Sequence, residues 1–343
     1  MHAELKRLVN KLNATLSERE GNQRVILPEL FKQLSELASP EAIPYLLSFL
    51  IHSEKQLADA AAETIAIISS KMNSAQFSQL DERIRARSYS TIKLRESWDA
   101  QRQELVPLMR RFEPQSVFMG LASMHHNGHV RELAVGALDL INDGSEIPYL
   151  LLRVTDWVPS VSNKAKAALR KRLHVENAGR FLANIVLVDA LRQRKRGDGA
   201  ELFQSIHNIA AEAQLSDFLK ELESNDRRAR RLCLYIALGI KISVRIEVIK
   251  QSLENSDNQV RRIALLSSVA HFSKADLSLL LQNALKDSFP SNRKEALRIM
   301  LSQYPESAEM ELKAALLDRS PSVRAFSRFH LKEKEAQFDF AQF

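Results

Sequence analysis

Apolar residues recur along the chain at the spacing of an amphipathic helix. In one segment they fall at i, i+4, i+7, i+8 and i+11, which is the buried stripe of such a helix. These five positions are Val130, Ala134, Ala137, Leu138 and Ile141. Six further stripes open at Leu57, Val161, Ala229, Val260, Asn292 and Val323. The pattern predicts a chain of helices with one buried face each.

The stripes follow a regular period. Successive first positions differ by 73, 31, 68, 31, 32 and 31 residues, so a repeat of 31 to 34 residues explains all but the first interval. Such a period is too short for a domain and suits a helical hairpin. The pentapeptide Ile-Pro-Tyr-Leu-Leu occurs twice, at Ile43–Leu47 and Ile147–Leu151. We interpret it as the first helix of two equivalent hairpins, with Pro opening the helix and Tyr-Leu-Leu packing inward.

Small side chains and turn residues support the same hairpin. The residue four places after the first stripe position is alanine at 134, 165, 264 and 296, which allows two helices to approach closely. Acidic residues precede the stripes, and their carboxylates suit the capping of the next helix. They are Asp156, Asp226, Asp257, Asp287 and Asp318. Prolines suit the helix start, where a missing N–H costs nothing. They are Pro159, Pro290 and Pro321.

These residues resemble HEAT repeats, specifically the bacterial subtype also called PBS-lyase HEAT-like. The segments IPYLLLRVTDWVPSVSNKAKAAL and NSDNQVRRIALL carry the likeness, which covers residues 25–72 and 114–333. The resemblance implies an all-α fold, an α-solenoid forming a right-handed superhelix of nine or ten hairpins. It implies little about function, because this repeat serves many unrelated tasks.

The repeat divides the chain into four parts. Residues 1–72 form N-terminal capping and HEAT-like hairpins, and residues 114–333 form the main array. Residues 73–113 lack a clear stripe, so we expect an irregular helical insertion. Residues 334–343, with Phe338, Phe340 and Phe343, form a tail. Within 176–213 we expect a helix to about Arg196, a Gly197-Asp198-Gly199 turn and a second helix.

Composition narrows the class of protein. Glycine (9) and proline (10) are scarce, which favours helices over all-β folds. Cys233 is alone, so no internal disulfide framework forms, which fits a reducing compartment. No apolar run approaches a membrane span and the N-terminus lacks a signal peptide, so we expect a cytoplasmic protein.

The net charge of +7 is local. Residues 151–200 hold 11 Lys/Arg against 4 Asp/Glu, and the other residues hold 38 of each. We predict a basic partner-binding surface from three groups of residues. They are Lys164, Lys166, Arg170, Lys171 and Arg172; Arg192, Arg194, Lys195 and Arg196; and Arg227, Arg228 and Arg231. An acidic protein, nucleic acid or an acidic membrane surface would fit it. A solvated face compensated by Glu221 and Glu223 is the alternative.

Five arginines follow the first stripe position, and we expect them to bond the turn carboxylates of the neighbouring repeat. They are Arg131, Arg230, Arg261, Arg293 and Arg324. Ser162 breaks this series. The group His125, His126 and His129 lies beside Asn127 and Gly128, so a surface turn is favoured over a metal site.

Catalytic signatures are sparse. No phosphate-binding, nucleophile-elbow, zincin or dinucleotide motif occurs. Two tryptophans flank acids, as Trp98-Asp99 and as Asp156-Trp157. The second pair suggests a remote similarity to HEAT-like DNA glycosylases, although Asp156 occupies the turn position of the repeat and Trp157 lies next to it. Cys233 lies on a buried stripe. The sequence therefore predicts a non-catalytic scaffold without cofactor or metal, which binds a protein or, alternatively, nucleic acid.

Overall fold

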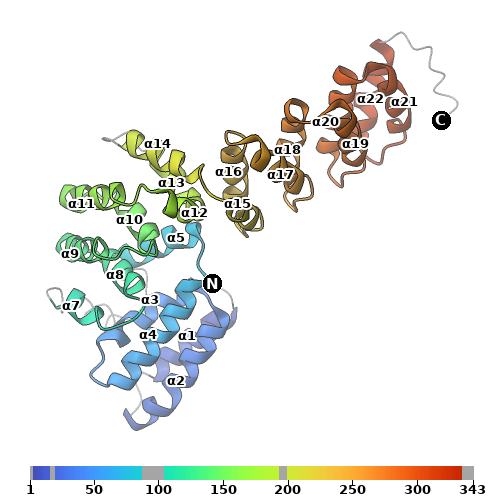
Figure 1. The fold of residues 1–343 in the computed structure, drawn as a ribbon. Helices are drawn as coiled ribbons and strands as arrows, with labels where there is room; N and C mark the ends of the chain where they lie inside the picture. The colour runs from blue at the N-terminus through green and yellow to red at the C-terminus, as the bar shows by residue number, and fades with distance from the viewer. Residues whose placement is uncertain (1–2, 16–19, 87–103, 193–198, 334–343) are drawn as a thin grey trace. The chain divides into compact units, whose positions relative to one another are not determined.

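The computed structural model describes residues 3–15, 20–86, 104–192 and 199–333. Every regular element within these ranges is an α-helix or a short 3₁₀ turn, and none of the described residues forms a strand. The chain divides into a first unit, Met1–Glu212, and a second unit, Ala213–Phe343 (Figure 1). The all-α class predicted from the periodicity is confirmed.

The first unit contains the longer part of the chain. Its helices are α1 (Ala3–Thr15), α2 (Glu20–Leu37), α3 (Ile43–Leu46), α4 (Lys55–Ser70), α5 (Ser74–Arg85), α7 (Leu105–Met109), α8 (Gln115–Ser123), α9 (Gly128–Leu138), α10 (Ile147–Arg153), α11 (Pro159–Arg170), α12 (Ala178–Ala183), α13 (Ile185–Arg192) and α14 (Gly199–Ala210). The 3₁₀ turns are η1 (Pro40–Ala42), η2 (Leu47–Ile51) and η3 (Val175–Asn177). Helix α1 packs on α2, α2 on α4, α8 on α9, and α9 and α10 on α11.

The second unit consists of eight helices within the described residues. They are α15 (Leu215–Leu222), α16 (Arg227–Ala237), α17 (Ile242–Leu253), α18 (Asn258–His271), α19 (Lys274–Ala284), α20 (Pro290–Gln303), α21 (Pro305–Ala315) and α22 (Pro321–Glu333). Each odd-numbered helix pairs with the even-numbered helix that follows it. The even-numbered helices α16, α18, α20 and α22 also pack on one another in chain order. We call this row of four helices the even layer.

The predicted stripes are the buried faces of the helices. The opening residues Leu57, Val130, Val161, Ala229, Val260, Asn292 and Val323 are at most 2% exposed. The alanines at positions 134, 165, 264 and 296 are fully buried where helices meet. The prolines at 159, 290 and 321 begin α11, α20 and α22. Three features read from the sequence are therefore confirmed: the helical period, the close contacts at alanine and the helix starts.

The repeated pentapeptide opens a helix at both places. Ile43–Leu46 forms α3, which packs on α4, and Ile147 begins α10, which packs on α11. Tyr45 is half-buried, whereas Tyr149 is 3% exposed. The ring of Tyr149 lies over Gly120 of α8 and makes an edge contact with Phe77 of α5, with ring centroids 5.1 Å apart. The two copies thus share a role in a helical pair but differ in how far the tyrosine is enclosed.

Two segments differ from the expected repeat. Helix α5, which we expected within an irregular insertion, packs on α10 and α13, and the Ser74 hydroxyl donates a hydrogen bond to the Ala183 carbonyl at 2.9 Å. The prediction of one continuous helix up to about Arg196 is wrong, because Asn184 interrupts it between α12 and α13. The Asn184 amide donates to the Arg180 carbonyl and competes with the backbone ladder. The predicted Gly197-Asp198 turn, Trp98, Asp99 and the tail 334–343 lie outside the described residues.

Two helical glycines give opposite expectations for the same substitution. A Cβ at Gly120 would lie 2.2 Å from the buried Tyr149 ring, whereas a Cβ at Gly136 of α9 meets no atom within 4 Å. We expect Gly120→Ala to destabilise the protein by about 1–3 kcal/mol through overpacking. Gly136→Ala is expected to stabilise it by about 0.5–1 kcal/mol through lower unfolded-state entropy. Denaturant unfolding followed by circular dichroism measures both, and equal effects at the two sites would contradict this packing.

Candidate partner-binding surface

Arginine–aspartate pairs connect successive helical pairs. Arg131 donates two hydrogen bonds to Asp156 at 2.8 and 2.9 Å, and Arg261 donates two to Asp287 at 2.7 and 2.8 Å. Arg293 does the same to Asp318 at 2.8 and 2.6 Å. The bonds expected between these arginines and the next turn's carboxylate are therefore confirmed at three positions.

The same arginines also hold their own turn. Nη1 of Arg131, Arg261 and Arg293 donates to the carbonyls six and five residues earlier. The aspartate accepts the backbone N–H two residues later, as Asp287 does from Phe289 at 2.7 Å. Each guanidinium thus joins the turn before its own helix to the turn of the next helical pair. We call this set of contacts the Arg–Asp ladder.

The ladder varies where its sequence varies. Arg230 stands 3.9 Å from Asp257, and its neighbour Arg231 makes the closer contacts to that carboxylate, at 2.8 and 3.1 Å. Arg324 holds its own turn, through the Asp318 carbonyl at 2.7 Å. Ser162, which replaces the arginine in α11, donates to the Val154 carbonyl at 2.6 Å. A serine at this position therefore closes its own turn without reaching the next one.

Buried arginines of the first unit were missed by sequence reasoning. Arg153 is fully buried, with Nη2 2.5 Å from Asp81 and Nη1 bonded to the Ser123 carbonyl at 2.8 Å. Arg85 approaches both Asp81 and Asp156 at 3.7 Å. Arg153 follows the second pentapeptide closely, and no spacing rule distinguishes it from a surface arginine. Part of the basic character of this segment is therefore internal.

Three of the five basic residues predicted on α11 and directly after it pair with carboxylates. Lys164 pairs with Glu132 at 2.8 Å and Lys171 with Asp139 at 2.5 Å. Arg172 is 1% exposed and bonds the Glu146 carboxylate and the Leu138 and Asp139 carbonyls. Lys166 is half-buried and Arg170 is exposed. The charge of this group is thus largely offset by α9 and the α9–α10 turn.

The remaining predicted residues fall in two places. Arg192, at the end of α13, stands 3.4 Å from Asp189, and Arg194, Lys195 and Arg196 lie outside the described residues. Arg227, Arg228 and Arg231 belong to α16 of the second unit, where the first two are exposed. Burial raises the pKa of Glu221 to about 7, so this carboxylate is only partly ionised near neutral pH. It compensates these arginines less than an ordinary surface glutamate would.

Charge in the second unit is segregated between layers. Helices α16, α18, α20 and α22 carry four, two, three and three Lys or Arg residues, twelve in all, against two acids, Glu295 and Glu333. Helices α15, α17, α19 and α21 together carry five basic and seven acidic residues. Glu295 is only 5% exposed. It pairs with Arg262 and Arg298, and the cations that the even layer exposes to solvent include Arg227, Arg328 and Lys332.

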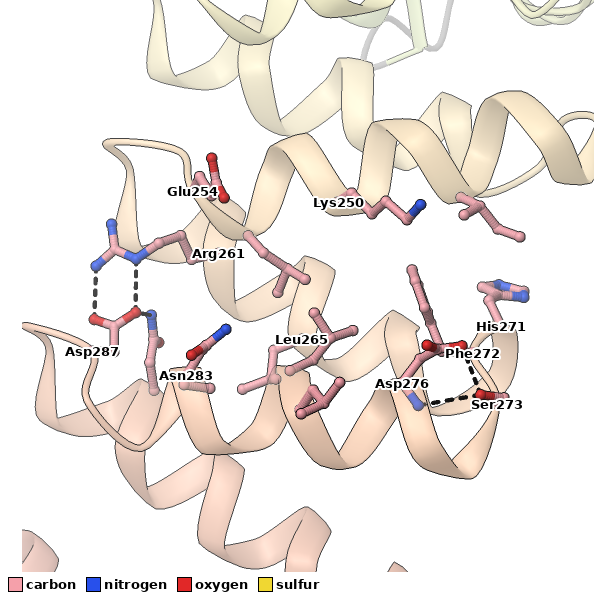
Figure 2. A pocket seen from close by; sticks show the side chains of 16 residues that line it. Lys250, Glu254, Arg261, Leu265, His271, Phe272, Ser273, Asp276, Asn283 and Asp287 are labelled. Carbon is pink, nitrogen blue, oxygen red and sulfur yellow. Dashed lines mark hydrogen bonds and ion pairs between the residues drawn. The ribbon is translucent and has the colours of Figure 1, made fainter.

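A pocket of about 670 Å³ opens between α17 and α19 over α18 (Figure 2). Leu253, Leu265 and Leu280 provide apolar lining. Arg261 and Asp287 pair with each other at one end, and Ser273 bonds Asp276 near the other. Lys250, Glu254, His271 and Asn283 add further polar groups, so the lining is mixed polar and apolar.

The candidate chemical groups have structural partners. Both Asp156 oxygens accept from Arg131, and one also accepts the Val158 N–H. Burial raises the pKa of Asp156, but these hydrogen bonds outweigh burial and lower it, so the carboxylate stays ionised. Trp157 is 74% exposed, with the Arg131 guanidinium 5.5 Å from its ring centre. This exposed ring lines no enclosed base-binding pocket.

The other candidates belong to turns and cores. Nδ1 of His125 accepts the Asn127 N–H at 3.0 Å, which is the turn contact that aspartate makes elsewhere. Cys233 is fully buried, and burial raises the pKa of its thiol. No cluster of three or more metal-ligating side chains occurs among the described residues. None of the helices in the described ranges is long and apolar enough to cross a bilayer.

Comparison with known proteins adds little to this geometry. No protein-family model matches the sequence, and no curated protein matches it. Among solved structures, the chain is similar to a crystallised engineered protein at 13% identity, over 96% of this chain and 99% of the other. The TM-score of 0.28 carries no argument about fold or function.

The ladder predicts a large effect at one arginine. Arg293→Ala would leave the Asp318 carboxylate and the Asp287 carbonyl without their buried donor, at an expected cost of about 2–3 kcal/mol. The exposed Arg328→Ala on α22 is the control and is expected to stay within about 0.5 kcal/mol. Amide hydrogen exchange of α20 and α22 measures both. Unchanged protection in Arg293→Ala would show that the ladder contributes no stability.

The ladder also predicts acid sensitivity. Burial raises the pKa of Asp287, but hydrogen bonds from Arg261, Asn292 and the Phe289 N–H lower it to about 2. Because the folded pKa lies below the unfolded value of about 3.9, the stabilisation is complete above about pH 4 and is lost as pH falls towards 2. Thermal unfolding between pH 6 and 2 should show a weaker acid loss in Asp287→Asn. Glu306→Gln, which removes an exposed carboxylate, should match the wild type; equal slopes for all three proteins would contradict the ladder.

Proposed function

We propose that this protein is a non-catalytic scaffold that binds an anionic macromolecular partner, in the first place an acidic protein. Its architecture in this proposal is an α-solenoid, a right-handed superhelix of HEAT-like hairpins. The charge segregation of the second unit carries the proposal, because the helices of the even layer hold twelve basic residues against two acids. The ladder arginines among them face turn aspartates, whereas Arg227, Arg328 and Lys332 are exposed and form the positive surface.

The contacts of the candidate catalytic residues favour binding over catalysis. Asp156, His125 and Cys233 are each used by a turn or a core, as described above. The partner surface in the proposal is the even layer, which includes the predicted Arg227, Arg228 and Arg231. The group on α11 is a weaker candidate because Glu132 and Asp139 offset Lys164 and Lys171. A cytoplasmic location belongs to the same proposal, since the one cysteine offers no internal disulfide.

Nucleic acid is the alternative partner. A cationic layer attracts phosphates as well as carboxylates, and its affinity for phosphates would fall steeply with salt. The even layer holds only two tyrosine or phenylalanine side chains that are strongly exposed, Tyr235 and Phe329. Base-stacking platforms use successive aromatic side chains along the strand. This scarcity favours an acidic protein.

Removing equal charge from each layer tests the proposal. One variant carries Arg227→Gln, Arg328→Gln and Lys332→Gln on the even layer; its control carries Lys220→Gln, Lys250→Gln and Lys313→Gln on α15, α17 and α21. The probe is a fluorescent polyglutamate peptide, measured by anisotropy at low and high salt. We expect about tenfold weaker binding for the first variant, because each removed charge costs about 0.5 kcal/mol of binding energy. The control should change little. Equal loss in both, or no binding by the wild type, would overturn the proposal.

A further inference from the structure

Exposed apolar side chains occupy one register position of the even layer. The residues five positions after the ladder arginines Arg230, Arg261, Arg293 and Arg324 are Tyr235, Leu266, Arg298 and Phe329. Tyr235, Leu266 and Phe329 are 57%, 44% and 58% exposed. Single exposed apolar residues are ordinary on a protein surface, but here they recur at one register position on three of the four helices of the even layer.

A row of cations runs beside these apolar residues. The position four residues earlier, on the same helix face, holds Arg231, Arg262 and Lys294 on α16, α18 and α20. Each of these three side chains is half-exposed. The acids that contact them, Asp257 and Glu295, are each 5% exposed. These acids offset Arg231 and Arg262, so Lys294 of this row and the exposed Arg328 and Lys332 of α22 supply the positive charge on the same layer as the apolar residues.

Lateral contacts make the face continuous from helix to helix. Arg231 of α16 reaches Asp257 at the start of α18, at 2.8 Å. Arg262 of α18 reaches Glu295 of α20 at 3.0 Å. The Arg298 guanidinium of α20 lies 5.7 Å from the ring centre of Phe326 on α22. Equivalent positions on α16, α18, α20 and α22 are thus held in register.

We propose that this face docks an acidic amphipathic segment of a partner protein, with its apolar side chains on Tyr235, Leu266 and Phe329 and its carboxylates beside Lys294, Arg328 and Lys332. This inference rests on the proposed function and names the partner's chemistry. Tyrosine and arginine are enriched among the few residues that contribute most of the binding energy at protein interfaces. A surface that holds both therefore concentrates the binding energy in one area. Four helices about 8–10 Å apart span roughly 25–30 Å, the length of a helix of about 18 residues.

Nucleic acid fits the same face less well. The two aromatic residues of the row, Tyr235 and Phe329, lie on α16 and α22, the first and last helices of the even layer. Between them lies Leu266, which cannot stack on a base. An acidic protein segment needs only apolar contacts at this spacing, and an aliphatic residue serves as well as an aromatic one. The chemistry of the row therefore selects an amphipathic protein segment.

The test uses two designed 18-residue peptides with the same number of glutamates. In one, leucines follow an i, i+3, i+4, i+7 pattern; in the other, serines replace these leucines. A single-stranded oligothymidylate of similar length is the third probe. Anisotropy with the full chain is expected to show at least about tenfold tighter binding of the leucine peptide.

Two matched triple variants locate the apolar contact. Tyr235→Ser, Leu266→Ser and Phe329→Ser change the even layer, whereas Ile242→Ser, Leu279→Ser and Met310→Ser remove equally exposed apolar residues from α17, α19 and α21. All six side chains are exposed, and circular dichroism checks that both variants fold. The first variant should bind both peptides equally, and the second should still prefer the leucine peptide.

The outcomes separate this inference from the proposed function. If the serine peptide binds as tightly as the leucine peptide, the face recognises charge only, and the inference fails while the proposed function stands. Loss of the preference in the second variant would place the contact on the other layer, where Leu279 lines the 670 Å³ pocket, and would also overturn it. Tighter binding of the oligothymidylate than of either peptide would assign the face to nucleic acid. If no probe binds, the proposed function fails as well.

Discussion

The bidentate bond from an arginine to the aspartate of the next turn is the contact on which the rest of the structure depends. A helical pair of about 31 residues cannot bury its apolar face alone, so its stability comes from the neighbouring pair. The Arg–Asp ladder joins neighbours at a constant offset of 25 or 26 residues, as in Arg261 with Asp287 and Arg293 with Asp318. The same guanidinium also bonds the turn before its own helix. It therefore fixes the position of one turn relative to the next helical pair.

The constant register of the helices determines which residues lie in rows on the surface. When α16, α18, α20 and α22 pack in chain order, residues at the same offset from the ladder arginine form rows. Charge that is evenly distributed in the linear sequence then becomes one-sided, with cations on one layer and most acids on the other. The same alignment places Tyr235, Leu266 and Phe329 in one row of the even layer, although they lie 31 and 63 residues apart in the sequence.

Basic residues serve two purposes in this molecule. Arg131, Arg153 and Arg172 are at most 1% exposed and hydrogen-bond carbonyls at helix ends, where buried polar groups need partners. Their charges are balanced by Asp81, Glu146 and Asp156. A count of Lys and Arg over residues 151–200 therefore overstates the positive surface, and a count by helix layer describes it better.

The sequence by itself determined the helical class, the buried stripes, the proline helix starts and the partners of Arg131, Arg261 and Arg293. All of these follow from local periodicity and from a repeat that places equivalent residues in equivalent contacts. Only the tertiary structure decided which cations face solvent, as the contrast between the buried Arg172 and the exposed Arg227 shows. It also decided that α5 packs on α10, that Asn184 interrupts a helix and that Tyr149 covers Gly120. The packing of α5 and of Tyr149 depends on contacts between segments far apart in the chain, which a local pattern does not encode. The break at Asn184 is a local competition between its side-chain amide and the backbone.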